Sequence, residues 1–229
     1  SAEAPSSADA PPESVTAAAA AGETASYADY RAAYPAAPAG SRIVLTPESA
    51  WEADGDGVTT QTDVQGEPSC WYLPESKTLR LRVEAAAAGR YTLRLRYLPA
   101  EGKGVELERA LRVNGAVPYE EASHLLLPRV WVNATEVQKD IYGHDIRPSQ
   151  IEHSRWQERL LQDSNGYYGE PLSVYLERGE NTLELTMTNE PMWLASVTLA
   201  APETLPDYET QLAAWRAAGA EEKTGLQLR

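Results

Sequence analysis

Between Asp140 and Tyr168 the chain gathers aromatic, amide, carboxylate and guanidinium side chains in the stretch DIYGHDIRPSQIEHSRWQERLLQDSNGYY. Aromatic rings can cover the apolar C–H face of a sugar ring, and planar polar groups can hydrogen-bond its hydroxyls. These residue types predict a ligand surface for carbohydrate that starts just before this stretch. The candidate ligand-binding residues are Trp131, Tyr142, Asp145, Arg147, Gln150, Trp156, Tyr167 and Tyr168.

Arg147 precedes Pro148, which restricts Arg147 to extended backbone and suits the rigid presentation of a side chain. Its guanidinium fits two roles. It can grip the paired hydroxyls or the carboxylate of a ligand, or it can form an internal salt bridge with Asp140, Asp145 or Glu152. Each aromatic ring of the region likewise fits either a ligand platform or a cover over the hydrophobic core.

Catalysis by this region would need two carboxylates, one of which stays protonated in a desolvated pocket, as in a glycosidase. The acidic residues here have basic neighbours, which favour the ionised forms. The chain also contains no HExxH motif, no GxSxG motif and no phosphate-binding loop. We therefore expect no enzymatic activity, and a jelly-roll glycosidase or lyase is kept as an alternative. The four carboxylates are Asp140, Asp145, Glu152 and Asp163.

The overall charge limits the classes of ligand. The 229 residues include 34 acidic and 20 basic residues, which gives a formal charge of −14. This charge disfavours nucleic acids, anionic membrane surfaces and polyanionic glycans unless a local basic site overrides it. A neutral oligosaccharide or polysaccharide is therefore favoured. The single cysteine, Cys70, excludes an intramolecular disulfide, and no apolar run is long enough to span a membrane.

The composition changes along the chain. The first residues are mostly Ala, Pro, Ser and Glu and cannot bury enough surface to become ordered. Ser26 is a suitable N-cap for a helix with tyrosines at helical spacing. A related pattern around Tyr208 and Trp215 fits either chance in an Ala-rich sequence or a helix that leads to a further domain. The expected parts are a disordered spacer at 1–25, a short helix and linker at 26–40, a β-sandwich at 41–204 and a C-terminal helix or linker at 205–229.

Between the two helical patterns, apolar and polar residues alternate with the period of β-strands. Asn114-Gly115 is a strong signal for a hairpin, and Arg178-Gly179 is expected to join two further strands as a hairpin. Several alternating strands without intervening helices predict an all-β fold, an antiparallel β-sandwich of jelly-roll type. The strands are expected at 78–84, 91–97, 105–113, 172–176, 183–187 and 193–199.

Four segments of the chain are distinctive: AGRYTLRLRYLP (88–99), GKGVELERALRVNGAVPYEEA (102–122), DIRPSQIE (145–152) and DSNGYYGEPLSVYLERGENTLELTMTNEPM (163–192). They resemble the β-sandwich modules attached to extracellular solute-binding lipoproteins of Gram-positive sugar ABC transporters. The turns are also similar to those of galactose-binding-like domains and of the carbohydrate-binding modules found beside glycoside hydrolases. This resemblance implies a non-catalytic, extracellular module, tethered at the cell surface, that captures oligosaccharide or polysaccharide for a transporter or hydrolase. A sandwich that positions a partner domain without binding sugar is the alternative.

The resemblance also implies that a structural calcium ion can be present, because many jelly-roll carbohydrate modules hold one near their first and last strands. No other cofactor is expected. The fragment Asp54-Gly55-Asp56-Gly57 is too short for an EF-hand loop and fits a solvated turn better than a calcium site. The candidate calcium ligands are Glu48, Glu52, Asp54 and Asp56.

Overall fold

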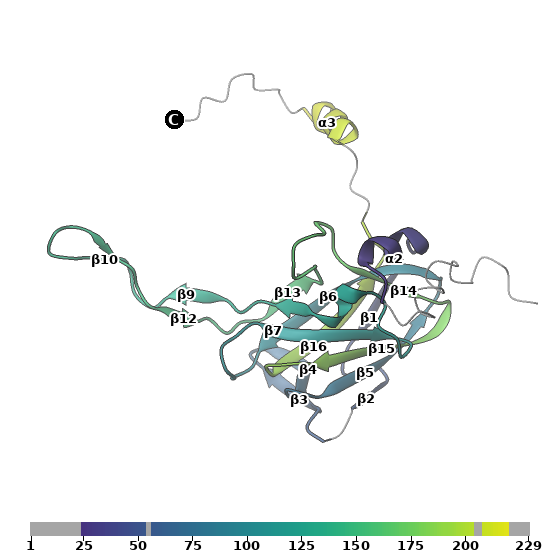
Figure 1. The fold of residues 1–229 in the computed structure, drawn as a ribbon, viewed down its shortest axis with the longest axis horizontal. Helices are drawn as coiled ribbons and strands as arrows, with labels where there is room; N and C mark the ends of the chain where they lie inside the picture. The colour runs from purple at the N-terminus through teal and green to yellow at the C-terminus, as the bar shows by residue number, and fades with distance from the viewer. Residues whose placement is uncertain (1–23, 54–55, 204–207, 220–229) are drawn as a thin grey trace, which may run out of the picture.

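A computed structural model describes residues 24–53, 56–203 and 208–219, which form an antiparallel β-sandwich with a short helix at each end (Figure 1). The predicted fold class is confirmed. The helices are α2 (Tyr27–Ala33), the 3₁₀ helix η1 (Glu120–Ser123) and α3 (Tyr208–Ala217). The strands are β1 (Arg42–Leu45), β2 (Trp51–Ala53), β3 (Thr59–Val64), β4 (Glu67–Leu73), β5 (Thr78–Ala85), β6 (Gly89–Pro99), β7 (Leu107–Val113), β8 (Leu125–Leu127), β9 (Trp131–Asn133), β10 (Gln138–Lys139), β11 (Asp145–Ile146), β12 (Gln150–Glu152), β13 (Gln157–Leu160), β14 (Ser173–Leu176), β15 (Gly179–Met187) and β16 (Met192–Ala200).

Two sheets make up the sandwich. The larger sheet has the strand order β13-β6-β16-β4-β3, and in addition β14 pairs with β6 and β1 pairs with β16. The smaller sheet has the order β2-β5-β15-β7-β8. The long central strands β6, β15 and β16 give each sheet a rigid middle, and side chains that point outward from these strands are held in fixed positions.

Alternation along the strands decides which side chains form the core. In β5, Leu79, Leu81 and Val83 are buried between the sheets, whereas Arg80 and Arg82 face solvent, as the sequence predicted. Both arginines form ion pairs with Glu52 of the neighbouring β2 (Nη1–Oε2 3.5 Å and Nη2–Oε1 2.8 Å). The polar face of this strand is therefore satisfied on the surface, and the apolar face supplies the core.

The expected N-terminal helix is present as α2 and belongs to the sandwich. Ser26 caps it, since the Ser26 Oγ accepts a hydrogen bond from the backbone N–H of Asp29 (3.3 Å). Tyr27 and Tyr30 are buried in the core, and the Tyr30 hydroxyl accepts a hydrogen bond from the Tyr175 N–H (2.8 Å). Burial raises the pKa of Tyr30 above its ordinary value. The helix thus closes one end of the core, whereas α3 has no buried residue.

The tight turn predicted at Asn114-Gly115 is present, since Val113 and Ala116 form an antiparallel bridge across it, and the chain then passes through η1 before β8 pairs with β7. The hairpin predicted at Arg178-Gly179 is wrong. At Gly179 the chain crosses from the larger sheet to the smaller one, because β14 pairs with β6 and β15 pairs with β5 and β7. The Asn181 amide shapes this crossing by donating to the carbonyls of Glu177 (2.8 Å) and Gly179 (3.0 Å). Turn residues mark a reversal of the chain but do not select its partner strand.

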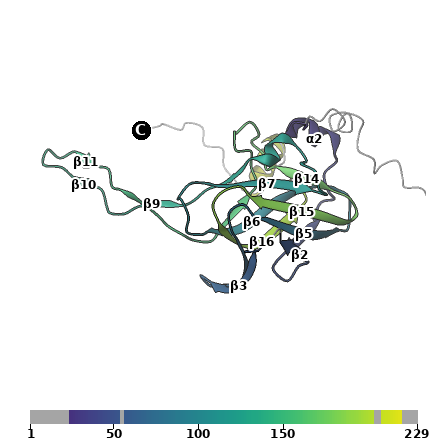
Figure 2. The same cartoon turned by 60° about the horizontal axis from the view of Figure 1, so that its bottom comes forward.

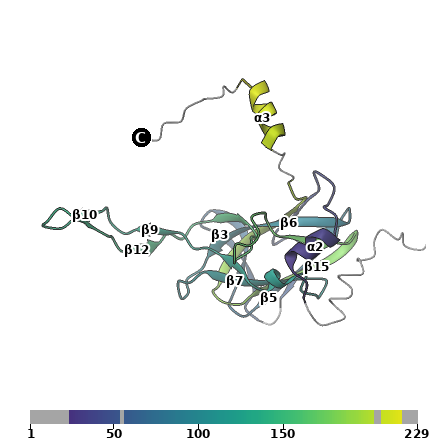
Figure 3. The same cartoon turned by 45° about the horizontal axis from the view of Figure 1, so that its top comes forward.

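Residues 130–153, here called the arm, leave the sandwich as a long ribbon that projects away from both sheets (Figures 1, 2 and 3). Two short antiparallel pairs hold it together, β9 with β12 and β10 with β11. No described segment packs over the ribbon as a second layer. The predicted ligand-binding residues are therefore divided between this arm, the segment between β12 and β13, and the loop between β13 and β14.

Several predictions fall on residues outside the described ranges. The disordered spacer at 1–25 lies almost wholly among them, so it stays a prediction, as do the boundaries of the module. Within the described part of the chain, no helix is both long and apolar enough to cross a membrane.

Candidate functional site

The eight predicted ligand-binding residues lie in three places and do not form one site. Five of them are spread along the arm, where Tyr142 is 78% exposed near the tip and Trp131 is 45% exposed near the base. Gln150 is the register partner of Asn133 on the ribbon, and the Asp145 carboxylate pairs with the Lys139 ammonium (3.1 Å). The Arg147 side chain forms no ion pair with any described residue, so the internal salt bridge considered for it is not present there.

Trp156 and Tyr168 serve the structure of the sandwich. The Trp156 indole N–H donates to the Val64 carbonyl (3.1 Å), and the Arg96 guanidinium lies over its ring, 5.5 Å from the centroid. The Tyr168 ring packs edge-on against Tyr27 (centroids 5.2 Å apart) beside the core. Tyr167, in the loop before β14, is exposed and remains open as a ligand contact.

The carboxylates considered for catalysis each hold local structure. Asp163 is buried and accepts hydrogen bonds from three backbone amides of its own loop, of which the shortest comes from Tyr167 (2.6 Å). Asp140 accepts from the N–H groups of Tyr142 (2.8 Å) and His144 (2.9 Å), and these bonds hold its pKa below the usual range. The other two carboxylates are held in ion pairs, Asp145 with Lys139 and Glu152 with Arg129.

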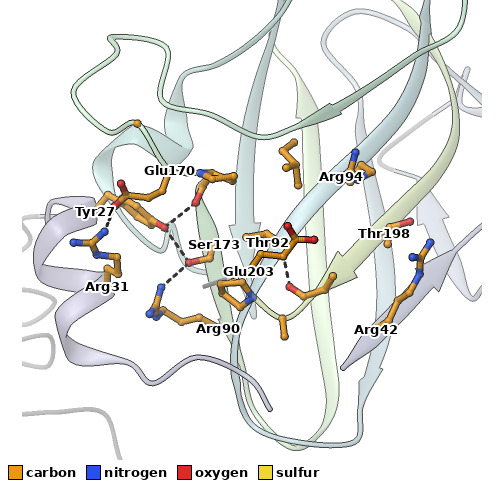
Figure 4. A pocket seen from close by; sticks show the side chains of 16 residues that line it. Tyr27, Arg31, Arg42, Arg90, Thr92, Arg94, Glu170, Ser173, Thr198 and Glu203 are labelled. Atoms are coloured by element: carbon orange, nitrogen blue, oxygen red, sulfur yellow. Dashed lines mark hydrogen bonds and ion pairs between the residues drawn. The ribbon is translucent and has the colours of Figure 1, made fainter. Parts of the chain in front are cut away.

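A pocket of about 660 Å³ lies on the outer face of the larger sheet, which the sequence analysis did not select (Figure 4). Its floor comes from β6, β14 and β16, and its walls come from α2, the 169–171 loop, β1 and the segment that follows β16. Strand alternation aims the floor side chains outward, opposite to the buried leucines of the same strands. The lining residues are Tyr27, Arg31, Arg42, Arg90, Thr92, Arg94, Leu160, Gly169, Glu170, Pro171, Ser173, Thr198, Ala200, Ala201, Pro202 and Glu203.

One half of the pocket is a fixed hydrogen-bond network next to α2. The Arg90 guanidinium donates to the Tyr34 carbonyl (2.6 Å) and to the Ser173 hydroxyl (3.0 Å). The Tyr27 hydroxyl lies 3.0 Å from the same Ser173 oxygen and donates to the Pro171 carbonyl (3.1 Å). Each of these groups is held by another, so this wall of the pocket is rigid before any ligand arrives.

The other half carries positive charge without a partner. Arg42 and Arg94 lie on the side of the pocket away from α2, near Thr198 (Figure 4), and neither forms an ion pair with a described residue. Arg31 is neutralised, because it pairs with Glu170. The remaining acidic lining residue, Glu203, has no ion pair in the described part of the chain. Two free guanidiniums and one free carboxylate leave this side of the pocket basic within a strongly acidic protein.

The chemistry of the pocket is that of a polar, multiply hydroxylated ligand with an acidic group. A guanidinium can bind a carboxylate through two parallel N–H···O bonds. The Thr198 hydroxyl can donate to or accept from ligand hydroxyls, whereas the Thr92 hydroxyl donates to the Ala200 carbonyl (3.1 Å) and can only accept. Leu160, Pro171 and Pro202 add apolar surface for C–H groups. The sequence did contain a signal for this site, because Arg90, Thr92 and Arg94 alternate with apolar residues at the start of the strand expected at 91–97, in an acidic protein.

The described residues do not provide a set of ligands for the predicted calcium ion. Glu52 forms ion pairs with two arginines of β5, and Thr46 donates a hydrogen bond to Glu48 (2.5 Å). Asp54 lies outside the described ranges. Among the residues that are described, no three acidic, histidine or cysteine side chains are grouped to hold a metal ion. A calcium site near these residues therefore stays a prediction.

No protein-family model matches the chain, and no curated protein matches it. Several solved structures are similar in fold at low identity. A family 35 carbohydrate-binding module from Clostridium thermocellum is 14% identical with a TM-score of 0.41, over 70% of this chain and 98% of the module. The CBM35 from Cellvibrio japonicus Abf62 is 19% identical with a TM-score of 0.44, over 71% of this chain and 95% of the module.

A third similar structure is the Podospora anserina GH26-CBM35 β-(1,4)-mannanase, which is 15% identical with a TM-score of 0.45. The match covers 73% of this chain but only 29% of the mannanase chain. The present chain therefore spans less than a third of that protein.

Proposed function

We propose that this protein is a non-catalytic carbohydrate-binding module whose ligand occupies the pocket on the outer face of the larger sheet. The observation that carries the proposal is the lining of that pocket, in which threonine hydroxyls and two unpaired arginines stand on rigid strands beside apolar surface. Planar guanidiniums and hydroxyls match the hydroxyl pattern of a sugar, and apolar side chains cover its C–H surface. The resemblance seen in the sequence supports the same ligand class.

The ligand carries an acidic group in this proposal. The net charge of −14 favoured a neutral glycan, unless a local basic site allowed an acidic one to bind. Arg42 and Arg94 supply such a site, since no described acidic residue neutralises them. A sugar carboxylate would bridge them, which makes an oligosaccharide that contains uronic acid the best-fitting class. The affinity expected of an open polar site is micromolar to millimolar, or about −4 to −8 kcal/mol.

The proposal includes the cellular setting that the sequence resemblance implies. The module acts outside the cell, is tethered at the cell surface, and retains oligosaccharide or polysaccharide for an associated sugar ABC transporter or glycoside hydrolase. Two observations support a module without catalysis. The four candidate carboxylates are engaged in turns and ion pairs, and the described lining of the pocket offers a single unpaired carboxylate, that of Glu203. A glycosidase needs two.

Arg94→Ala is expected to weaken binding of an acidic oligosaccharide about 10- to 100-fold, because it removes a charge-assisted hydrogen bond. A glycan array with the full chain, holding both neutral and uronic-acid oligosaccharides, identifies the ligand, and isothermal titration measures the change. The matched control is Arg112→Ala, which removes an exposed arginine from the smaller sheet. The control should bind like the wild type.

The outcomes separate the possible sites. Binding of neutral glycans alone would refute the acidic ligand, and binding that is unchanged in Arg94→Ala would refute the pocket. Loss of binding in Arg147→Ala or Tyr142→Ala, with Arg94→Ala unaffected, would move the site to the arm. An array without any bound glycan would favour the alternative of an interaction module.

A further inference from the structure

The arm has the structure of a rigid projection. Its two legs are joined at the base by the hydrogen bond from the His153 N–H to the Val130 carbonyl (2.8 Å). Arg129, directly before the arm, is buried and donates to the carbonyls of Val105 (2.8 Å) and Ala100 (3.1 Å). The same guanidinium bonds to the Glu152 carboxylate at the end of the arm (2.6 Å). Both legs are therefore fixed to the sandwich at one buried cation.

The surface of the arm is apolar to an extent found nowhere else in the described chain. Twelve large hydrophobic side chains are exposed in the described chain as a whole, and seven of the twelve lie in the arm. Ile141 is 91% exposed at the tip, and Val132 and Ile151 are register partners on one face of the ribbon. Branched aliphatic groups offer no hydrogen bonds to a sugar and are typical of protein contacts. The seven are Trp131, Val132, Val137, Ile141, Tyr142, Ile146 and Ile151.

The unpaired charges of the arm suit contact with a second copy of the same arm. Lys139 pairs with Asp145, Asp140 with His144 and Glu152 with Arg129. The two remaining charged residues of the arm, Glu136 and Arg147, have no ion pair with any described residue, and they have opposite signs.

They also stand at a similar height on opposite legs, since Gln138 and Ile146 are register partners. A second arm that runs antiparallel, related by a two-fold axis at this height, would place Arg147 of each copy beside Glu136 of the other.

We propose that the arm is a self-association surface, through which two copies of this chain pair their arms antiparallel about a two-fold axis. This arrangement covers the aliphatic groups of both ribbons and forms two Glu136–Arg147 ion pairs. It also places the two sandwich bodies at opposite ends of the paired arms. Each chain carries a formal charge of −14, so this separation reduces the repulsion between the bodies.

The test is the oligomeric state of the full chain, measured by sedimentation velocity over a range of protein concentrations. The wild type is expected to form a dimer. Ile146→Asp and Ile151→Asp each place a charge in the paired surface and should raise the dimer dissociation constant about 10-fold or more. Val44→Asp is the control, because Val44 is 48% exposed on the sandwich and Ile146 is 49% exposed on the arm. All three positions are exposed, so circular dichroism should show intact folds.

Charge exchange tests the antiparallel geometry. Glu136→Arg alone and Arg147→Glu alone should each weaken the dimer by placing like charges opposite one another, and the double variant should restore it. A wild type that is monomeric at every concentration would overturn the proposal, and so would a dimer that survives both aspartate variants. A dimer that is lost in those variants but is not restored by the double charge exchange would overturn the two-fold pairing in favour of another use of the arm.

Discussion

Replacing Arg129 with alanine is expected to lower the free energy of unfolding by about 3 to 5 kcal/mol, the usual cost of breaking a buried ion pair from one side. The Arg129 side chain is 2% exposed, and it bonds to the carboxylate of Glu190, whose side chain is 0% exposed. Without the guanidinium, that carboxylate would keep the Lys103 N–H (2.8 Å) but lose its cation. Urea unfolding of the wild type and the variant measures the change through the midpoint and the slope.

Two further variants show whether the loss of stability in Arg129→Ala comes from the buried ion pair. Arg112→Ala removes an exposed arginine and should change the unfolding free energy by no more than about 0.5 kcal/mol. The double variant Arg129→Met and Glu190→Gln should recover part of the lost stability, because it removes the buried carboxylate and keeps an acceptor for the Lys103 N–H. A loss below about 1 kcal/mol in Arg129→Ala would show that the carboxylate is satisfied without the arginine. Faster proteolysis within 130–153 should accompany the loss, because Arg129 fixes both legs of the arm.

The sequence predicted the strands of the sandwich better than their pairing. Alternation identified β5, β6, β15 and β16 because the burial of one face depends on local period alone. Pairing depends on contacts between distant segments, which a turn motif does not contain. The Gly179 turn therefore looked like a hairpin, although it carries the chain from one sheet to the other.

The candidate site was predicted less well, for a physical reason. The ligand residues were chosen by density within one stretch of sequence, but the pocket is assembled from segments between Tyr27 and Glu203. The one local signal was the repeated arginine on the outer face of β6, at Arg90, Arg94 and Arg96. Because 130–153 extends as an arm, none of the five chosen residues on it lines the pocket.

Buried charge was also invisible in the sequence. Arg109 lies on β7 among alternating residues whose buried face was expected to be apolar, yet it is fully buried. It donates to the carbonyls of Glu108 (2.7 Å), Asn189 (2.6 Å) and Glu190 (3.1 Å), and burial lowers its pKa to about 9. The guanidinium therefore satisfies two carbonyls of the turn between β15 and β16. Only the three-dimensional contacts show why a charged side chain is present at this core position.

The pocket and the arm have a joint consequence if both proposals hold. A single open polar site binds weakly, whereas a dimer presents two sites to one polymer at a high effective concentration. The pocket is bounded by α2 and β1, and the arm leaves the sandwich elsewhere, so pairing of the arms need not cover the pocket. Variants that abolish the dimer should therefore weaken binding to a polysaccharide more than binding to a short oligosaccharide.

Gly89→Ala is expected to lower the free energy of unfolding by about 3 to 5 kcal/mol, through backbone strain and overpacking together. Gly89 has a φ of +150°, and a Cβ atom there would lie 2.4 Å from the Ala37 Cα and 2.5 Å from the Ala37 N. The neighbouring Arg90 carbonyl accepts from the Ala37 N–H (3.0 Å), and the Arg90 N–H donates to the Pro35 carbonyl (2.8 Å). The added methyl group would force this segment away from β6, and α2 directly precedes it.

Gly179→Ala is the matched control, because Gly179 has a φ of +100° and no atom within 4 Å of an added Cβ. It introduces strain alone and should cost about 1 to 2 kcal/mol. Urea unfolding of both variants separates the two effects. Equal losses would show that the contact with Ala37 relaxes easily and that α2 is held mainly by its tyrosines. A larger loss in Gly89→Ala should also weaken ligand binding, because the Arg90 guanidinium in the pocket is anchored to the Tyr34 carbonyl of the displaced segment.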